Sequence, residues 1–441
     1  MKKKVALHNL GCKVNAYEAE AMQQLLKQAG YEIVPFDTGA DVYVVNTCTV
    51  TNIADRKSRQ MLHKAKKMNP DAVVVATGCY AQTDTAKLKE DGAVDLILGN
   101  NQKKNIVEAL SEYEEKHCKK AHIIKINQTK EYETLAIAQT AEHVRAYMKV
   151  QDGCNQFCTY CVIPYARGRV RSRKMGDILK EVHALADNGY KELVLTGIHL
   201  SSYGVDFADS EKETLLTLIR AVHQVEGIQR IRLGSLEPQI VTEEFAAGIA
   251  ALPKVCPHFH LSLQSGCDRT LANMNRRYHS GEYAERCALL RRYYENPALT
   301  TDVIVGFPME TEEDFQASYD FVSGIHFYET HIFKYSRRRG TKAAAMEGQL
   351  TETVKAKRSE KMLELHDRRA KEYENSMLGK QLELLLEEEM TIHGEAYLVG
   401  HSREYVKAAV KKREGIDVND IVLAKAEDFL EKNLLRCSIL A

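Results

Sequence analysis

Short apolar runs alternate with longer amphipathic stretches over the first 120 residues of the chain. Apolar runs between turn residues are typical of buried strands, and here they lie at residues 5–10, 31–36, 42–46, 72–77 and 94–98. One helical pattern runs from a predicted cap at Asn15 to Gly30, and another starts at Thr51 or Asn52 and stops before Pro70. This alternation predicts a doubly wound parallel sheet, so we expect residues 1–120 to form an α/β domain.

A second series of strand and helix patterns is predicted over residues 141–370. Its strands are expected at residues 146–150, 193–196, 230–233, 258–263, 301–305 and 329–334, with helical patterns such as 175–188 between them. Six βα units are fewer than the eight of a closed barrel, so we expect a partial (βα)6 barrel with its chemistry at the carboxyl ends of the strands. Residues 121–140 have a weaker pattern and are predicted to link the two domains.

The last part of the chain changes character again. Residues 351–377 form a highly charged helical pattern, which predicts an exposed or bridging helix. After it, short strand patterns punctuated by glycines lie at residues 381–387, 392–399, 405–410 and 421–426. We therefore expect residues 377–441 to form a small β-barrel.

Composition narrows the function classes. The 441 residues are 44% hydrophobic, and Lys+Arg and Asp+Glu both number 61, so a nucleic-acid partner would have to be bound by local patches. Eleven cysteines in a long chain do not form an even disulfide framework, which favours a reducing compartment. No apolar run approaches the length of a membrane span, so we expect a cytoplasmic protein with no membrane partner.

Three cysteines, Cys154, Cys158 and Cys161, lie within eight residues directly after a predicted strand. Thiolates are soft ligands that hold iron–sulfur clusters, and a structural zinc site would want a fourth ligand that is not placed nearby. Three thiolates leave one iron of a [4Fe–4S] cluster open to a small chelating molecule. The alternative is three ordinary cysteines in a loop, which seldom cluster so closely.

Three further cysteines occupy matching positions in the first domain. Cys12, Cys48 and Cys79 each follow the carboxyl end of a predicted strand, and these ends share one edge of a parallel sheet. They should therefore converge in space, either as a second three-thiol site or as buried inert cysteines. Gly11 and Gly78 precede two of them and allow tight turns.

The spacing Cys154-x3-Cys158-x2-Cys161, with Tyr160 before the last cysteine, resembles the radical S-adenosylmethionine enzymes. Together with the segments around the other three cysteines, nearly the whole chain resembles the methylthiotransferases. The resemblance implies that a C–H bond is replaced by C–S–CH3. It implies two [4Fe–4S] clusters, one binding S-adenosylmethionine on Cys154, Cys158 and Cys161 and the other handling sulfur on Cys12, Cys48 and Cys79. S-adenosylmethionine would serve as both methyl donor and radical source, and the electron would come from a reduced flavodoxin- or ferredoxin-type donor.

Loops after the later strands are expected to line the mouth of the barrel and to hold S-adenosylmethionine. The residues named for this pocket are Gly197, Glu237 and Gln264. Taken singly, such loops are also ordinary βα turns.

Local basic runs are candidates for RNA contact. Residues 145–180 contain eight Lys or Arg and two acidic residues, and a second basic run covers residues 334–342. Clustered arginines suit phosphates, although a solvated charged face is the plain alternative. The predicted RNA-binding residues are Arg167, Arg169, Arg171, Arg173, Arg337, Arg338 and Arg339. The last domain, with nine basic and twelve acidic residues, resembles the TRAM-like module of tRNA methylthiotransferases and could use only one face.

The sequence from Gly11 to Glu18 is most similar to the branch that modifies N6-threonylcarbamoyladenosine at position 37, next to the anticodon of tRNA. The alternatives are methylthiolation of N6-isopentenyladenosine or of a ribosomal protein. A rival of another class is a non-catalytic iron–sulfur sensor that binds RNA.

Overall fold

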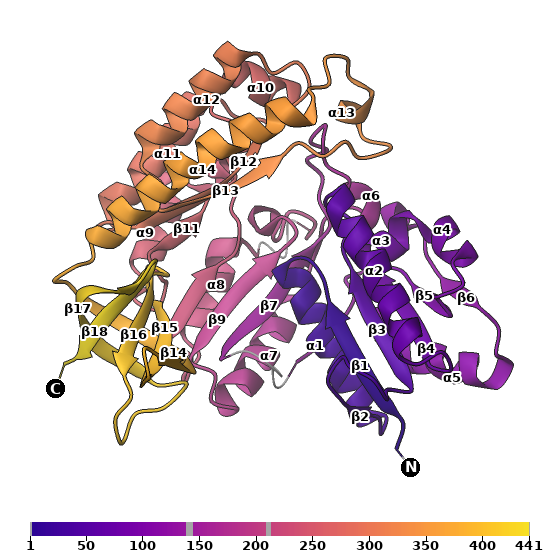
Figure 1. Cartoon of the computed structure of the whole chain (residues 1–441). Coiled ribbons are helices and arrows are strands. Elements are labelled where there is room, and N and C mark those ends of the chain that lie inside the picture. The colour runs from indigo at the N-terminus through magenta and orange to yellow at the C-terminus, as the bar shows by residue number, and fades with distance from the viewer. Residues whose placement is uncertain (1, 138–143, 209–212, 441) are drawn as a thin grey trace.

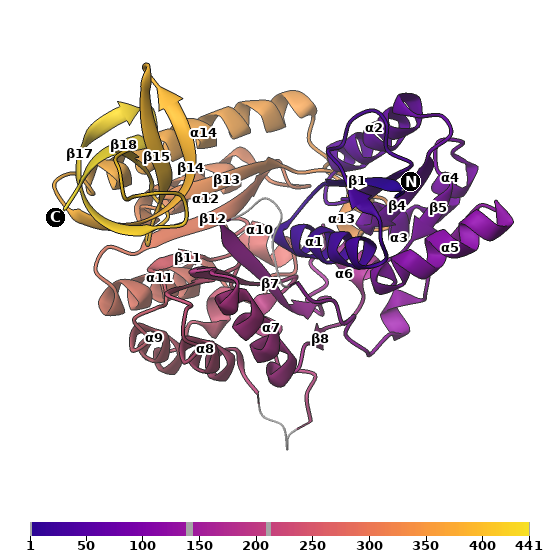
Figure 2. The same ribbon diagram turned by 90° about the horizontal axis from the view of Figure 1, so that it is seen from below.

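The computed structural model describes residues 2–137, 144–208 and 213–440. The N-terminal domain lies on one side of the central parallel strands and a C-terminal barrel lies on the other (Figures 1 and 2). In these ranges no helix combines the length and apolar character needed to cross a membrane.

A six-stranded parallel sheet forms the N-terminal domain, in the order β2-β1-β3-β4-β5-β6. Its strands are β1 Lys4–Asn9, β2 Glu32–Ile33, β3 Val42–Thr47, β4 Val73–Gly78, β5 Leu96–Leu98 and β6 Lys120–His122. Its helices are α1 Lys13–Gln28, α2 Asn52–Met68, α3 Cys79–Thr83, α4 Thr85–Glu90 and α5 Ile106–Lys116. Alternate residues of β3 pack into separate apolar clusters on the two faces, so the predicted doubly wound α/β sheet is confirmed. The sixth strand falls in the stretch that was expected to be a linker.

The two helix starts predicted in this domain differ in outcome. Thr51 caps α2, since its side chain accepts a hydrogen bond from the Ala54 amide. The prediction that Asn15 caps α1 is wrong, because the helix begins at Lys13 with Cys12 as its N-cap. The Asn15 side-chain amide instead donates to the Leu10 carbonyl at 2.7 Å and holds the turn after β1.

Two adjoining sheets make up the central domain and together curve into a partial barrel. Strands β10-β9-β7-β8 form one sheet and β11-β12-β13 the other, joined by isolated bridges from Ile231 to Val255 and from Leu236 to Leu261. The strands are β7 Arg145–Asp152, β8 Arg171–Ser172, β9 Glu192–Gly197, β10 Arg230–Leu233, β11 His258–His260, β12 Ala298–Val305 and β13 Glu329–Lys334. The short β8 runs antiparallel to β7, and the other six are the predicted strands, which confirms the partial (βα)6 barrel. The predicted start of this domain at residue 141 lies outside the described residues.

The helices of the central domain are α6 Ile163–Arg167, α7 Met175–Asp187, α8 Leu215–His223, α9 Glu243–Ala250, α10 Asp268–Asn273, α11 Ser280–Tyr293, α12 Glu312–Ile325 and α13 Lys342–Ala345. Helices α7, α8, α9, α11 and α12 cover one face of these strands, whereas α6 packs against α3 of the N-terminal domain. Leu193, Phe259 and Val303 belong to a single core beneath the helices. The strand residues that alternate with them, such as Glu192, His258 and Asp302, therefore face the concave side of the half-barrel.

A long helix, α14 Glu352–Asn375, leads to the C-terminal barrel. Met362 and Leu365 pack into the core of the central domain, whereas Ala370 and Tyr373 pack into that of the barrel, so the helix bridges the two. The barrel is closed in the order β14-β15-β16-β18-β17, as the predicted fold class requires. Its strands are β14 Gln381–Ile392, β15 Glu395–Ser402, β16 Lys407–Lys411, β17 Ile421–Glu431 and β18 Leu434–Ile439. The sequence reading had missed β18, which closes the barrel.

Candidate active site

The loop that carries Cys154, Cys158 and Cys161 follows β7 directly. Its turn needs glycine, because Gly153 has φ +73° and an added Cβ would lie 1.8 Å from the Arg169 carbonyl oxygen. Within the loop, the Cys161 amide donates to the Cys158 carbonyl at 3.0 Å. The loop is therefore held by its own backbone and leaves three thiols close together.

These three thiols suit a metal cluster better than a nucleophile. Burial raises the pKa of Cys154 to about 11 and that of Cys161 to about 12. A buried thiol with a raised pKa is protonated at neutral pH, whereas coordination by metal ions stabilises the thiolate. The donor set and its surroundings therefore fit the open three-thiolate cluster site that the sequence predicts.

Arg276 connects the cysteine loop to a carboxylate that the sequence analysis placed in the S-adenosylmethionine pocket. Its Nη1 donates to Cys158 Sγ at 3.1 Å, and its Nη2 donates to Glu237 Oε2 at 2.5 Å. His199 Nε2 approaches the same carboxylate at 3.6 Å. Burial opposes ionisation of Glu237, but Arg276 and His199 outweigh it and keep its pKa below the ordinary value. Arg276 was missed from the sequence, where it is one arginine in a helix-rich stretch.

The other two residues predicted for this pocket also lie near the loop. Gly197 ends β9, and an added Cβ there would come within 2.8 Å of Gln151 Oε1. The Gln151 amide in turn donates to the Gly153 carbonyl at 2.7 Å, at the start of the cysteine loop. Gln264 has φ +71°, a left-handed conformation, and lines a cavity together with Tyr160.

The three N-terminal cysteines converge at the carboxyl edge of the first sheet. A Cβ on Gly11 would lie 3.1 Å from Cys48 Sγ, so the turn before Cys12 passes directly over that thiol. Burial and the neighbouring Cys79 raise the pKa of Cys12 and bring that of Cys48 to about 11. As in the loop of Cys154, Cys158 and Cys161, such thiols need a cation to remain thiolates. The structure therefore brings together the residues expected to hold a second cluster.

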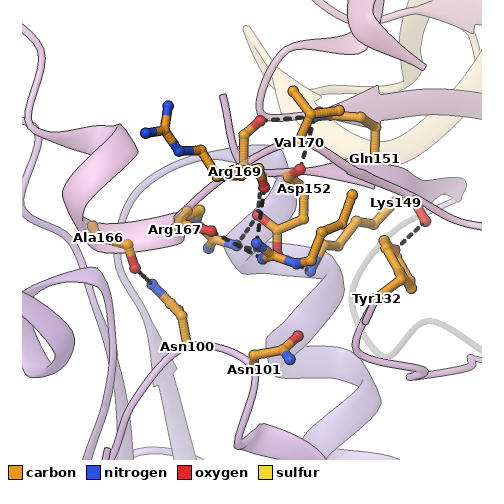
Figure 3. Close-up of polar contacts among 12 residues, drawn as sticks. Asn100, Asn101, Tyr132, Lys149, Gln151, Asp152, Ala166, Arg167, Arg169 and Val170 are labelled. Carbon is orange, nitrogen blue, oxygen red and sulfur yellow. Dashed lines mark hydrogen bonds and ion pairs between the residues drawn. The ribbon is translucent and has the colours of Figure 1, made fainter. Parts of the chain in front are cut away.

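Arg167 joins the N-terminal thiols to the central domain. Its Nε donates to Cys79 Sγ at 3.3 Å, and its Nη2 donates to Asn15 Oδ1 at 2.5 Å. Its Nη1 lies 2.7 Å from Glu18 of α1 and 3.2 Å from Asp152 of β7. Figure 3 shows the side chains of Lys149, Asp152 and Arg167 lying close together.

The ion network around Arg167 is almost completely shielded from solvent. Glu18 also contacts Lys103 Nζ at 2.8 Å and Lys149 Nζ at 2.7 Å, and all of these side chains are fully buried. Arg167, Lys103 and Lys149 outweigh burial and hold the pKa of Glu18 well below its ordinary value. Because Glu18 and Lys103 belong to the first domain and the others to the second, the network fixes the two domains against each other.

The structure corrects part of the predicted RNA surface. Arg167, Arg171 and Arg173 are buried and bound within the protein, so they cannot meet phosphates. Arg338 is also buried, with Nη1 2.7 Å from Asp55 Oδ2 of α2. A run of arginines in the sequence does not reveal burial, and the partners Glu18 of Arg167 and Asp55 of Arg338 lie far away along the chain. Three of the predicted residues, Arg169, Arg337 and Arg339, are exposed.

A cavity of about 160 Å3 lies between the two domains and is lined by residues from both cysteine-bearing segments. The first domain contributes Val50 and Thr51, which follow Cys48 by two and three residues. Tyr160 comes from the other cysteine loop, and Asp302 and Phe333 come from β12 and β13. The remaining lining residues are Gln264, Ile304, Lys334, Tyr335 and Ser336. A planar group in this cavity would be accessible to chemistry from both sides.

Two family models match separate parts of the chain. Residues 4–99 match the model described as uncharacterized protein family UPF0004, and residues 148–322 match the radical SAM superfamily. Each match contains one set of three cysteines.

Several curated proteins are similar over nearly the full length. The threonylcarbamoyladenosine tRNA methylthiotransferase MtaB of Bacillus subtilis (strain 168) is 42% identical over 96% of this chain and 93% of its own. The protein of the same name in Aquifex aeolicus (strain VF5) is 43% identical over 90% and 95% of the two chains. The tRNA-2-methylthio-N(6)-dimethylallyladenosine synthase of Moorella thermoacetica is 37% identical over 86% and 85%.

Among solved structures, the chain resembles the radical S-adenosylmethionine methyltransferase TsrM from Kitasatospora setae, determined with cobalamin and a [4Fe-4S] cluster bound. The TM-score is 0.56 at 16% identity, covering 78% of this chain and 77% of that one. At this identity the likeness concerns the fold alone.

Proposed function

The chain belongs to the radical S-adenosylmethionine methylthiotransferases of tRNA, and we propose that it converts N6-threonylcarbamoyladenosine at position 37 into its 2-methylthio derivative. The observation that carries this proposal is the cavity between the two domains, because Val50 and Thr51 after Cys48 and Tyr160 before Cys161 line it together. The B. subtilis and A. aeolicus relatives, named for threonylcarbamoyladenosine, are more identical to this chain than the M. thermoacetica relative named for dimethylallyladenosine.

Two cluster sites follow from this assignment. Cys154, Cys158 and Cys161 would hold a [4Fe–4S] cluster with an iron open to S-adenosylmethionine, and Cys12, Cys48 and Cys79 would hold a second one. When bound, these groups supply the electron, the radical chemistry, the sulfur and the methyl group. A reduced flavodoxin- or ferredoxin-type protein would be the electron donor.

The protein's own residues bind and orient the reactants. Gly197, Glu237 and Gln264 would line the S-adenosylmethionine pocket, with Arg276 keeping Glu237 ionised beside the cysteine loop. The exposed ring of Phe333 and the side chain of Ile304 give the cavity an apolar wall on which an adenine could stack. The base must leave its stack in the anticodon loop to enter this cavity.

Phosphates of the tRNA would meet the rim of the cleft. Arg169 is exposed and stacks over Phe157 at 4.5 Å, next to the exposed ring of Tyr165. Arg339 and Tyr165 line a neighbouring hollow of about 490 Å3. Together with Arg337, these residues form the part of the predicted RNA surface that we retain.

Mass spectrometry of tRNA nucleosides from cells with and without the gene tests the assignment. We expect the 2-methylthio form of threonylcarbamoyladenosine to disappear and its precursor to accumulate. Loss of the methylthio group from the isopentenyl nucleoside instead would identify the other tRNA branch. No change in either nucleoside would point to a protein substrate or to a non-catalytic sensor.

The two cysteine sets can be separated with purified variants. Cys154→Ala should abolish reductive cleavage of S-adenosylmethionine, whereas Cys48→Ala should retain cleavage but form no methylthio product. Normal product from Cys48→Ala would contradict the two-cluster assignment. Absence of cleavage in the reconstituted wild type would favour the sensor.

A further inference from the structure

Lys13 presents a free cation to the concave side of the half-barrel. It is the first residue of α1, its side chain is exposed, and among residues 2–137, 144–208 and 213–440 it has no hydrogen-bond or ion-pair partner. The charged groups that act on it electrostatically are Arg145 of β7 and Arg232 of β10 and, more weakly, the carboxylates of Glu192 and Glu329. The N-terminal domain therefore extends an ammonium group towards the inner face of the central strands.

The neighbouring arginines are already paired, unlike Lys13. Arg145 Nε lies 3.3 Å from Glu387, and Arg232 Nε lies 2.9 Å from Glu192. Both guanidinium groups also stack on the ring of Tyr405, at 4.9 and 4.7 Å. Lys13 is thus the cation of this group that remains available to an incoming anion.

A second donor group, His331 with His260, lies on the same concave face. The ring of His331 is exposed and stacks on that of His260 at 5.6 Å. His260 Nε2 lies 3.4 Å from Asp302, and its Nδ1 is 2.9 Å from Thr300 Oγ1. Asp302 also lines the cavity, so the pair of imidazole rings borders the cavity through this carboxylate.

The spacing along β13 matches the length of the modified base. Phe333 and His331 are two residues apart on one face of the strand, a rise of about 6.6 Å. The threonylcarbamoyl group is a urea attached to one amino acid and spans about 5 Å from N6 to its carboxylate. An adenine stacked on Phe333 with its N6 substituent directed along β13 would therefore place that carboxylate next to His331.

We propose that Lys13 and His331 form an anion subsite that binds the carboxylate of the N6 substituent. This inference rests on the proposed function and adds to it a reason for the choice of base. A threonylcarbamoyl carboxylate would pair the ammonium of Lys13, whereas an isopentenyl group is neutral and apolar and would leave that ammonium unpaired against hydrocarbon. A site built to bind a polar group rejects an analogue that lacks it.

The test uses the reconstituted full-length enzyme and two anticodon stem-loop RNAs that differ only in the N6 substituent, threonylcarbamoyl or isopentenyl. Lys13→Gln should raise KM for the threonylcarbamoyl RNA about tenfold or more, whereas Lys13→Arg should keep KM close to the wild-type value. Turnover of the isopentenyl RNA and reductive cleavage of S-adenosylmethionine should not fall. Lys64→Gln, an exposed lysine on α2, is the matched control.

A second variant guards against an indirect effect on the neighbouring Cys12. His331 lies on β13 and is not adjacent in sequence to any of the six cysteines, and His331→Gln should shift the preference between the two RNAs in the same direction. Equal losses on both RNAs would mean that Lys13 contacts a phosphate and would overturn the subsite. Impaired cleavage of S-adenosylmethionine in Lys13→Gln would overturn it too, as would unchanged kinetics. Failure of the wild type to modify the threonylcarbamoyl RNA would instead refute the proposed function itself.

Discussion

Arg276 is the residue through which the cysteine loop and the proposed cofactor pocket affect each other. It is 5% exposed and contacts Cys158, Glu237 and the Tyr278 hydroxyl. A buried guanidinium between a thiolate and a carboxylate lowers the free energy of both charges. The same contact orients the Glu237 carboxylate towards the mouth of the barrel.

Arg276→Met should therefore weaken S-adenosylmethionine binding without removing either set of cysteines. Loss of charge-assisted hydrogen bonds of about 1.5–3 kcal/mol corresponds to a rise in KM of roughly ten- to hundredfold in the reductive cleavage assay. Arg277→Met, at the next position along the chain, is the matched control. An unchanged KM would show that Glu237 does not take part in binding the cofactor.

At Gly78 the backbone itself is needed to place a thiol. This residue has φ +93°, and an added Cβ would lie 2.6 Å from both Asn46 Oδ1 and the Thr47 carbonyl oxygen. Gly78→Ala should cost about 1–3 kcal/mol in backbone strain and displace the adjacent Cys79. The purified protein should then lose roughly half of its iron. Gly92→Ala, which has open space around the added Cβ, should keep all of it.

The sequence analysis placed the cysteines but did not predict the roles of Arg167 and Arg276. Cys12, Cys48 and Cys79 could be placed because each follows a strand, and strand ends in a parallel sheet share one edge. Cys154, Cys158 and Cys161 could be grouped because they lie within eight residues. The burial of Arg167 could not be foreseen, because its partners Glu18, Asn15 and Cys79 are distant in the sequence. Arg276 lacked any local signal, since its role depends on two loops that meet only in the folded chain.

At the scale of elements, the buried charges join helix α1 to strand β7. Glu18 faces Lys103, Lys149 and Arg167, all four side chains are fully buried, and the buried Asp152 also contacts Lys149 and Arg167. Removing Glu18 leaves three buried cations against the single carboxylate of Asp152, which is far more costly than losing a surface ion pair.

Glu18→Gln should therefore destabilise the protein by about 3–5 kcal/mol, measured by anaerobic urea unfolding of the cluster-loaded enzyme. Glu114→Gln removes a partly exposed pair with Lys3 and should change stability by less than about 1 kcal/mol. Similar stability for the two variants would mean that water or a bound ion compensates the buried cations.

At the scale of the whole molecule, the C-terminal barrel closes one end of the half-barrel. Tyr405 stacks on His258 of β11 at 5.0 Å and contacts the guanidinium groups of Arg145 and Arg232. Backbone carbonyls of the barrel add to this contact, since Arg230 Nη2 donates to the Glu383 carbonyl at 2.8 Å. His401 and Arg403 of the barrel pack here as well.

Tyr405→Ala should loosen this interface while leaving both domains folded, because each has its own apolar core. Two lost cation–π contacts and the lost ring stacking should weaken docking by about 2–4 kcal/mol. We expect limited proteolysis to release the barrel after α14 faster than in wild type, while cleavage of S-adenosylmethionine persists. Leu423→Ala, at an exposed barrel residue, should show wild-type proteolysis.

The same substitution also tests the anion subsite. Because Arg145 and Arg232 also border Lys13, the loosened barrel should reduce the preference for threonylcarbamoyl over isopentenyl RNA. An unchanged preference would show that the anion subsite is organised by the first two domains alone.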